Sequence, residues 1–117
     1  MEKFKISDYI VEPKGKVAKR MIYKDENVIS FILNISKGES LPNHTHFDST
    51  VLLQVIQGSA NLKVDDKTSP IQENDLIQLD GPESMSVENN DNEILILYVT
   101  ISPAPPSEKY SVDVDLE

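Results

Sequence analysis

The sequence contains no cysteine among its 117 residues. Disulfides, thiolate metal sites and cysteine nucleophiles are therefore excluded. The first residues carry charges, among them Glu2, Lys3 and Asp8, where a secretory signal peptide would need an apolar core. Both observations predict a cytoplasmic protein, in which the sequons at Asn34 and Asn43 are chance matches.

Long apolar runs and positive charge are also scarce. No run approaches the roughly 18 consecutive apolar residues of a membrane span. The chain has 11 basic and 20 acidic residues, a net charge of -9 at pH 7. Nucleic acids and anionic membranes are bound mainly through Lys and Arg, so neither is an expected partner.

The positive charge is unevenly placed. Residues 1–24, the lead segment, contain seven basic and three acidic groups, a net of +4, whereas the rest of the chain carries a net of -13. We expect the lead segment to lie across its own fold or a second subunit, or to form a solvated basic edge strand.

Several catalytic motifs are missing. The sequence has no Gly-rich phosphate loop, no Gly-x-Ser-x-Gly elbow and no zincin helix. Arg20 is the sole arginine, which argues against a dedicated phosphate or carboxylate clamp. The acidic clusters at 65–66, 73–75 and 91–93 fall in turn sequences, so we interpret them as solvated loops.

Strand patterns fill most of the chain instead. Ile29, Phe31, Leu33 and Ile35 share one parity, which predicts a half-buried strand over 28–35. Two further runs are apolar at both parities, as in strands buried on both faces or covered by a partner subunit: 50–56 and 94–101. Shorter strands are predicted at 17–23, 60–65, 75–79 and 84–88.

Turn sequences rich in Asn, Asp and Gly separate these strands every eight to twelve residues or so, a spacing typical of all-β sandwiches and barrels. The Pro-rich stretch 103–106 ends the last long strand and stiffens a linker. After it, Tyr110, Val112, Val114 and Leu116 alternate with polar residues, which predicts a late edge strand or a docked tail.

The two histidines, His44 and His46, are separated by one residue. On a strand, side chains at i and i+2 share a face, so two neutral imidazoles could grip one metal ion while Thr45 points away. A hydrogen-bonded polar pair lining a pocket is the alternative.

Together with two glycines the histidines read Gly38-x5-His44-x-His46-x11-Gly58, which resembles the first motif of the cupin family. A second cupin motif can be aligned with residues 74–89, where Asn89 matches. Asn74 and Pro82 stand at its two glycines, Asp80 at its proline and Met85 at its histidine. The resemblance covers about 30–102. It implies an all-β, cupin-type double-stranded β-helix, which is a jelly-roll barrel.

In this interpretation residues 1–117 form a single cupin-like domain. Its core barrel spans about 28–102, basic N-terminal strands occupy 1–24, and a Pro-rich linker and tail occupy 103–117.

The resemblance also implies a degenerate metal site. Metal-binding cupins hold a divalent ion with three histidines and a glutamate. Carried over to this sequence, only His44 and His46 remain, because Val51 and Met85 stand at the other two positions. We therefore expect no cofactor, or at most a weakly bound Zn, Ni, Fe or Mn ion, with Asp48 or Gln54 as the conceivable third ligand. The thioether of Met85 suits only copper(I).

Three functions follow as hypotheses. The first is a barrel that binds a small, largely apolar or uncharged molecule in a pocket formed by His44, His46, Val51 and Met85. The second is a metal-dependent cupin enzyme of the dioxygenase, isomerase or decarboxylase type that uses His44 and His46, with no other catalytic residue assigned. The third is a homodimeric structural or regulatory module that pairs through 94–101 and the lead segment.

Overall fold

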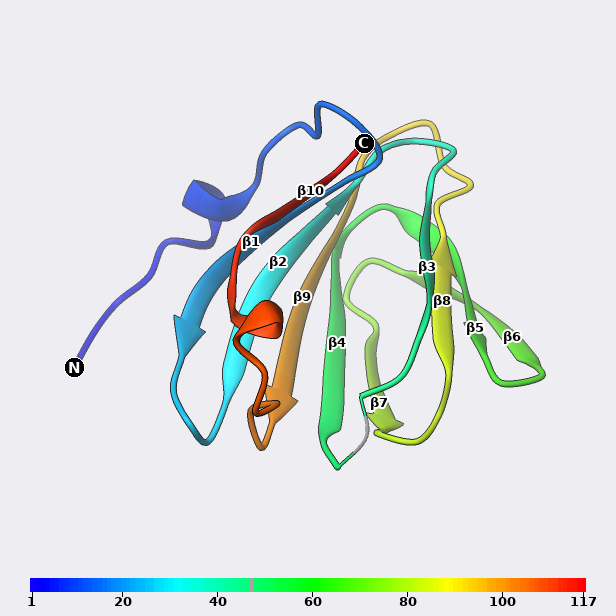
Figure 1. Ribbon diagram of the computed structural model, residues 1–117. Helices are drawn as coiled ribbons and strands as arrows, with labels where there is room; N and C mark the ends of the chain where they lie inside the picture. The colour runs from blue at the N-terminus through cyan, green and yellow to red at the C-terminus, as the bar shows by residue number, and fades with distance from the viewer. Residues whose placement is uncertain (47) are drawn as a thin grey trace.

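The computed structural model describes residues 1–46 and 48–117. Within them, two antiparallel sheets face each other (Figure 1). The six-stranded sheet has the order β10 (Val114–Leu116), β1 (Val17–Lys24), β2 (Ile29–Ile35), β9 (Leu95–Ser102), β4 (Thr50–Gln57), β7 (Leu76–Asp80). The four-stranded sheet has the order β3 (Ser40–His44), β8 (Met85–Glu88), β5 (Ser59–Val64), β6 (Lys67–Gln72). The all-β jelly-roll prediction is confirmed.

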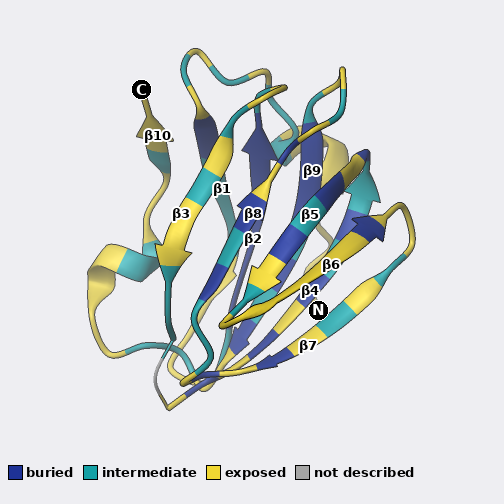
Figure 2. Ribbon diagram, turned by 90° about the vertical axis from the view of Figure 1, so that its right-hand side faces the viewer, coloured by how far each residue is buried: buried dark blue, intermediate teal, exposed yellow. Residues whose placement is uncertain are grey.

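The core lies between the two sheets and follows strand parity. Along β4, Val51, Leu53 and Val55 are buried, whereas Leu52 between them is 40% exposed on the outer face. Figure 2 shows the same alternation of buried and exposed residues along β5. Strand β9 is apolar at both parities because it lies between β2 and β4 and Ile96, on its outer parity, is also buried.

Strand β2 was expected to be half-buried, and this prediction is wrong, since all seven of its residues are buried. Its outer-parity residue Asn34 is fully buried under the lead segment. The Asn34 side chain accepts a hydrogen bond from the Val11 amide (3.2 Å) and donates to the carbonyls of Tyr9 (3.2 Å) and Ala18 (3.1 Å). The lead segment therefore lies across its own sheet.

The lead segment contains one strand, β1, and not several. Before β1 it forms the short 3-10 helix η1 (Ile6–Tyr9), which contacts β1 and β2. β1 is not an edge strand either, because β10 pairs with its other side. No helix in the described ranges is long and apolar enough to span a membrane.

Two strands were not predicted, β3 and β6. Five of the six residues of β6 are exposed, and Pro70 stands within it, so neither alternation nor β-propensity marks it in the sequence. Strand β3 likewise contains Pro42 and few apolar residues. Both lie at edges of the four-stranded sheet, where proline is tolerated.

The motif residues at the turns have backbone roles. Gly38 (φ 74°) and Gly58 (φ 95°) adopt the left-handed conformation between consecutive strands, which glycine enters without a steric penalty. Asn74, which replaces a motif glycine, also has a positive φ of 74°. Asparagine is among the few residues with a side chain that tolerate this region, so the replacement preserves the turn.

Candidate functional site

His44 and His46 lie together at one end of the barrel, which we call the histidine end. β3 ends at His44, and His46 lies in the loop beyond it, so the two do not share a strand face as expected. Leu41 pairs with Val87 and His44 with Met85, so the register shifts by one residue between them. This bulge turns His44 to the core side of the sheet, which simple alternation from Leu41 would not do.

The two imidazole rings meet edge to face. Their centroids are 4.8 Å apart and the ring planes are inclined by 87°. Nδ1 of His44 lies 2.8 Å from the Pro42 carbonyl oxygen, which can only accept. In the neutral ring this contact places the proton on Nδ1 and leaves the lone pair of Nε2 to accept a hydrogen bond.

His46 has an unsatisfied polar atom. Its Nδ1 is buried and has no hydrogen-bond partner among the described residues. Burial lowers the pKa of His46 to about 4, and the neighbouring charges of His44 and Lys19 act in the same direction. The ring is therefore neutral at pH 7, and its Nδ1 can either donate or accept one hydrogen bond.

The loop that carries His46 is fixed by its backbone. The His46 amide donates to the Gly81 carbonyl (3.0 Å), and the Ser49 amide donates to the His46 carbonyl (3.1 Å). Any side chain at position 81 would collide with the carbonyl oxygens of His46 and Ser49, so this approach requires glycine. The Ser49 hydroxyl in turn donates to the Pro103 carbonyl (2.8 Å).

Val51 and Met85 lie in the core and do not substitute for metal ligands. Val51 is 2% exposed, and Met85, opposite His44 and Val64, is 3% exposed. They give the histidine end an apolar floor. Gln54 lies on the outer parity of β4, and Asp48 is exposed in the loop, so neither joins the histidines.

The donor set therefore does not fit the metal of the cupin resemblance. No group of three or more His, Asp or Glu residues that could hold a metal occurs within 1–46 and 48–117. Catalytic metal sites generally need three protein ligands. The positive charge of Lys19 close to His46 further disfavours a cation.

The C-terminal tail (103–117) covers the histidine end. Tyr110, in the 3-10 helix η2 (Glu108–Ser111), packs on the core, and its ring centroid lies 6.0 Å from that of His46. From η2 the tail returns as β10 along β1, as Figure 1 shows in orange and red. The sequence predicts a late edge strand or a docked tail, and the structure has both, since β10 is an edge strand and η2 docks on the core.

Lys19 completes the site, and the sequence interpretation missed it. Its Nζ donates to the Tyr110 carbonyl oxygen (2.7 Å) and lies 4.4 Å from the centroid of the Phe31 ring. Burial lowers the pKa of Lys19, and the carboxylate of Asp113 acts against that shift. A usable signal exists in the sequence, because Lys19 shares its parity with the apolar Val17 and Met21.

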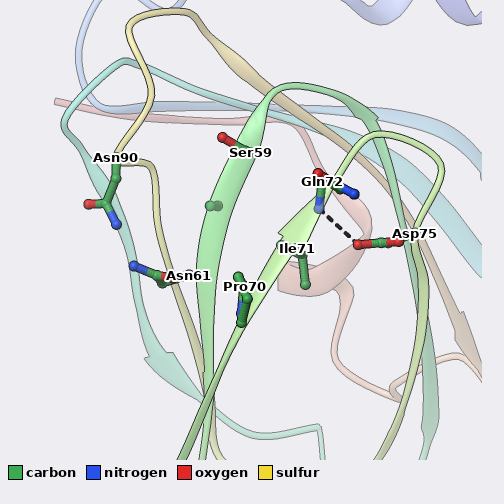
Figure 3. A pocket seen from close by; sticks show the side chains of 8 residues that line it. Ser59, Asn61, Pro70, Ile71, Gln72, Asp75 and Asn90 are labelled. Carbon is green, nitrogen blue, oxygen red and sulfur yellow. Dashed lines mark hydrogen bonds between the residues drawn. The ribbon is translucent and has the colours of Figure 1, made fainter.

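The open hollows described on the surface lie elsewhere. One of about 340 Å³ beside β5 and β6 is lined by apolar side chains such as Ile71 together with polar ones, among them Asn61 and Asp75 (Figure 3). Another of about 420 Å³ opens between β6 and β7, has Leu62, Ile71 and Leu79 in its wall, and carries acidic residues at its rim. The histidine end, by contrast, is occupied by the tail.

Comparison with known proteins identifies the fold. No protein-family model matches the sequence, and no curated protein is significantly similar to it. Among solved structures, an uncharacterized conserved protein with a double-stranded β-helix domain from Klebsiella pneumoniae superposes with a TM-score of 0.84 at 14% identity, over 92% of this chain and 94% of that one. An RmlC-like cupin protein from Desulfovibrio desulfuricans gives 0.78 at 17% identity, over 88% and 97%.

A third neighbour is described as a predicted oxalate decarboxylase from Thermotoga maritima. It gives a TM-score of 0.70 at 22% identity, over 76% of this chain and 82% of that one. These likenesses confirm the predicted cupin-type double-stranded β-helix. At such identities they establish the fold alone, because function resides in the residues of the site.

Proposed function

We propose that this cupin-fold chain binds a small molecule at the histidine end of its barrel, and that its metal site is degenerate. The observation that carries the proposal is the buried Nδ1 of His46, which has no hydrogen-bond partner within 1–46 and 48–117. A buried polar atom without a partner costs about 1–3 kcal/mol, so a ligand that supplies the missing hydrogen bond gains that amount.

The surroundings suit an organic ligand better than an ion. His46 presents a neutral ring, and the Nε2 atom of His44 is left to the ligand because its Nδ1 lies on the Pro42 carbonyl, so both rings can hydrogen-bond an organic ligand. Val51 and Met85 add apolar surface below them. A few placed polar groups over an apolar floor are typical of small-molecule sites.

The metal-dependent enzyme is the weaker alternative. The predicted oxalate decarboxylase shares the fold, yet Val51 and Met85 here stand where the cupin resemblance would need a glutamate and a histidine. We accordingly propose binding without a tightly held metal. The absence of cysteine supports a cytoplasmic location for this activity.

Methionine methyl NMR tests the binding site directly. The chain has three methionines: Met85 beside His44, Met21 on β1, and the exposed Met1 as an internal reference. Phenol, a neutral mimic of the Tyr110 ring, serves as the first probe of a fragment set. We expect it to shift the Met85 methyl and leave Met1 unchanged.

Two variants locate the bound probe. His46→Gln should weaken phenol binding, whereas Asn61→Ala, in the hollow of Figure 3, should leave it unchanged. If no fragment shifts Met85 in the wild-type chain, or if only Asn61→Ala alters binding, the proposed site is wrong.

We also propose that the chain forms a homodimer, but through another surface than the expected 94–101 and lead segment. Strand β9 lies inside its sheet and is largely buried, and the lead segment lies across its own sheet. On the outer face of the six-stranded sheet, Leu76 is 65% exposed and Leu52 is 40% exposed, on the paired strands β7 and β4. Light scattering should give twice the 13.1 kDa chain mass at micromolar concentration. Leu76→Lys should reduce the mass to that of a monomer, while Thr68→Lys on β6 should not, and a monomeric wild type would refute the dimer.

A further inference from the structure

The tail supplies Lys19 with a hydrogen-bond acceptor and with a nearby negative charge. The Tyr110 carbonyl oxygen accepts a hydrogen bond from Nζ at 2.7 Å, and the Asp113 carboxylate supplies a nearby negative charge. The hydrogen bond of Asp113 is to another group, since its Oδ1 accepts from the Met21 amide at 2.7 Å. The half-buried ammonium group of Lys19 therefore donates to a neutral carbonyl oxygen, while the carboxylate of Asp113 accepts from the Met21 amide.

The tail also places an aromatic ring beside the histidines. The Tyr110 ring lies against His46 while the carbonyl group of the same residue lies on Lys19. Tyr110 thus contacts His46 with its ring and Lys19 with its carbonyl group. A molecule with a ring or short apolar body and one oxygen group would make both contacts in the same way.

We propose that the histidine end, with the tail displaced, is a carboxylate site in which Lys19 binds the carboxylate and His46 and the apolar floor hold the body of a small apolar acid. The inference rests on the proposed function and names its ligand class. It revises the uncharged ligand expected from sequence, because Lys19 was not then part of the site.

The physical reason is the pairing of charge and hydrogen bond. A carboxylate combines in one group the oxygen that Tyr110 supplies and the charge that Asp113 supplies. The bond from the Lys19 ammonium group to the Tyr110 carbonyl is already charge-assisted. A carboxylate at the same place adds the attraction of a full opposite charge, which a half-buried site screens less than bulk water does. The exchange therefore favours an anionic ligand over the tail, whereas a neutral ligand of the same shape gains only what the tail already provides.

The tail is bound by contacts that can be exchanged. Besides Tyr110, the tail is held by the Arg20–Asp115 ion pair (2.9 Å), by Lys24 Nζ on the Ser111 carbonyl (3.3 Å) and by the three-residue strand β10. The Met21 amide on Asp113 (2.7 Å) and the Ser49 hydroxyl on the Pro103 carbonyl (2.8 Å) hold it as well. Asp115 and Lys24 are exposed, and exposed ion pairs contribute little. Tyr110 is the tail side chain that packs on both the core and His46.

The experiment compares phenylacetate with its neutral isostere phenylacetamide on the full chain, by calorimetry and by methionine methyl shifts. We expect phenylacetate to bind about tenfold more tightly than the amide, as the attraction of a full opposite charge at a half-buried site would give. The acid should shift both Met21, two residues from Lys19, and Met85. Tyr110→Ala should tighten binding of the acid, since the competing ring is removed.

Lys19 variants decide the assignment. Lys19→Met should bring the two affinities to within a factor of about two, Lys19→Arg should retain the preference, and Lys63→Met on β5 is the matched control that should change nothing. Thermal melting establishes that each variant is folded. If Tyr110→Ala does not fold, Asp113→Asn, which loosens the tail through an exposed residue, replaces it with the same expectation.

The outcomes separate the two proposals. If acid and amide shift Met85 with equal affinity, or if Lys19→Met keeps the preference for the acid, the carboxylate site is refuted and small-molecule binding stands. If no compound of the fragment set, phenylacetate and phenylacetamide included, shifts Met85 in the wild-type chain, both proposals fail. If only neutral compounds shift it, the carboxylate site fails alone.

Discussion

A buried polar side chain lies at each end of the barrel, and the two differ in whether their polar atoms are hydrogen-bonded. At the end away from the histidines, Asn89 is fully buried and both polar atoms of its side chain are hydrogen-bonded. Its amide nitrogen donates to the carbonyls of Ile35 (3.1 Å), Ser36 (3.1 Å) and Glu93 (2.9 Å), and its oxygen accepts from the Asp91 amide (3.0 Å). At the histidine end, Nδ1 of His46 has no partner among the described residues.

This difference separates structural from functional polar groups. A fully satisfied buried amide ties strands together and gains nothing from a ligand. A buried polar group without a partner destabilises the fold until a ligand supplies the missing hydrogen bond, and each such group in a native protein needs an explanation. The same cupin-motif resemblance points to both ends, at Asn89 and at the histidines, so the motif alone does not distinguish them.

The largest expected loss of stability follows from a substitution of Asn89, at the end away from the histidines. Asn89→Ala removes four hydrogen bonds at a fully buried position, although the Ser36 carbonyl keeps the Glu39 amide (3.1 Å), and we expect the free energy of unfolding to fall by about 3 kcal/mol. Urea denaturation measures the change. The exposed neighbour is the control, since Asn90→Ala should stay within about 0.5 kcal/mol. A stable Asn89→Ala variant would remove the contrast between the ends.

The next effect compares a glycine from each end. Gly81→Ala pushes a methyl group against the carbonyls of His46 and Ser49, and we expect a loss of about 2 kcal/mol with a shift of the His46 ring resonances. Gly38→Ala meets open space but keeps a positive φ, so about 1 kcal/mol is expected. Thermal and urea unfolding rank the two, and the reverse order would contradict the packing of the His46 loop.

Acid should weaken the fold through the histidine end. The pKa of His46 is lowered to about 4 from the ordinary 6.5, so between these values the unfolded chain binds a proton that the folded chain does not. Stability is therefore lost as pH falls from about 6.5 toward 4. With solvent screening of the partly exposed ring, the loss is about 1–2 kcal/mol. Unfolding curves of His46→Gln should lack this component; an unchanged pH dependence would refute it.

The smallest expected effect is that of metal. Elemental analysis of protein purified from rich medium without chelator should find far less than one metal per chain, as in the His44→Ala/His46→Ala double variant. Near-stoichiometric metal that the double variant loses would show that a further ligand completes the histidine pair. That result would favour the enzyme hypothesis over the binding hypothesis.

The sequence predicted the fold well because the core strands carry clear patterns. Strands such as β4 and β9 bury an entire parity, and Asn, Asp and Gly mark the turns between them. Strands β3 and β6 escaped prediction because edge strands bury little and tolerate proline. Half-burial of β2 was wrong because its outer face is covered by the lead segment, a contact between distant parts of the chain.

The site was predicted less completely. The pair of His44 and His46 is visible in the sequence, and the cupin resemblance implies that Val51 and Met85 replace the other ligands. The bulge that turns His44 inward depends on pairing with β8, which no local pattern encodes. Lys19 and Tyr110 meet the histidines only because the tail folds back on β1, more than 90 residues away in sequence from its partner.

The central place of β9 has a consequence for synthesis on the ribosome. Its neighbours β2 and β4 are made first, yet both pair with a strand that begins at Leu95. Until that strand leaves the exit tunnel, the facing edges of β2 and β4 stay open, and the tail that covers the histidines comes later still. The nascent chain is therefore exposed to misassociation for most of its translation, and chaperone dependence should fall sharply once β9 has emerged.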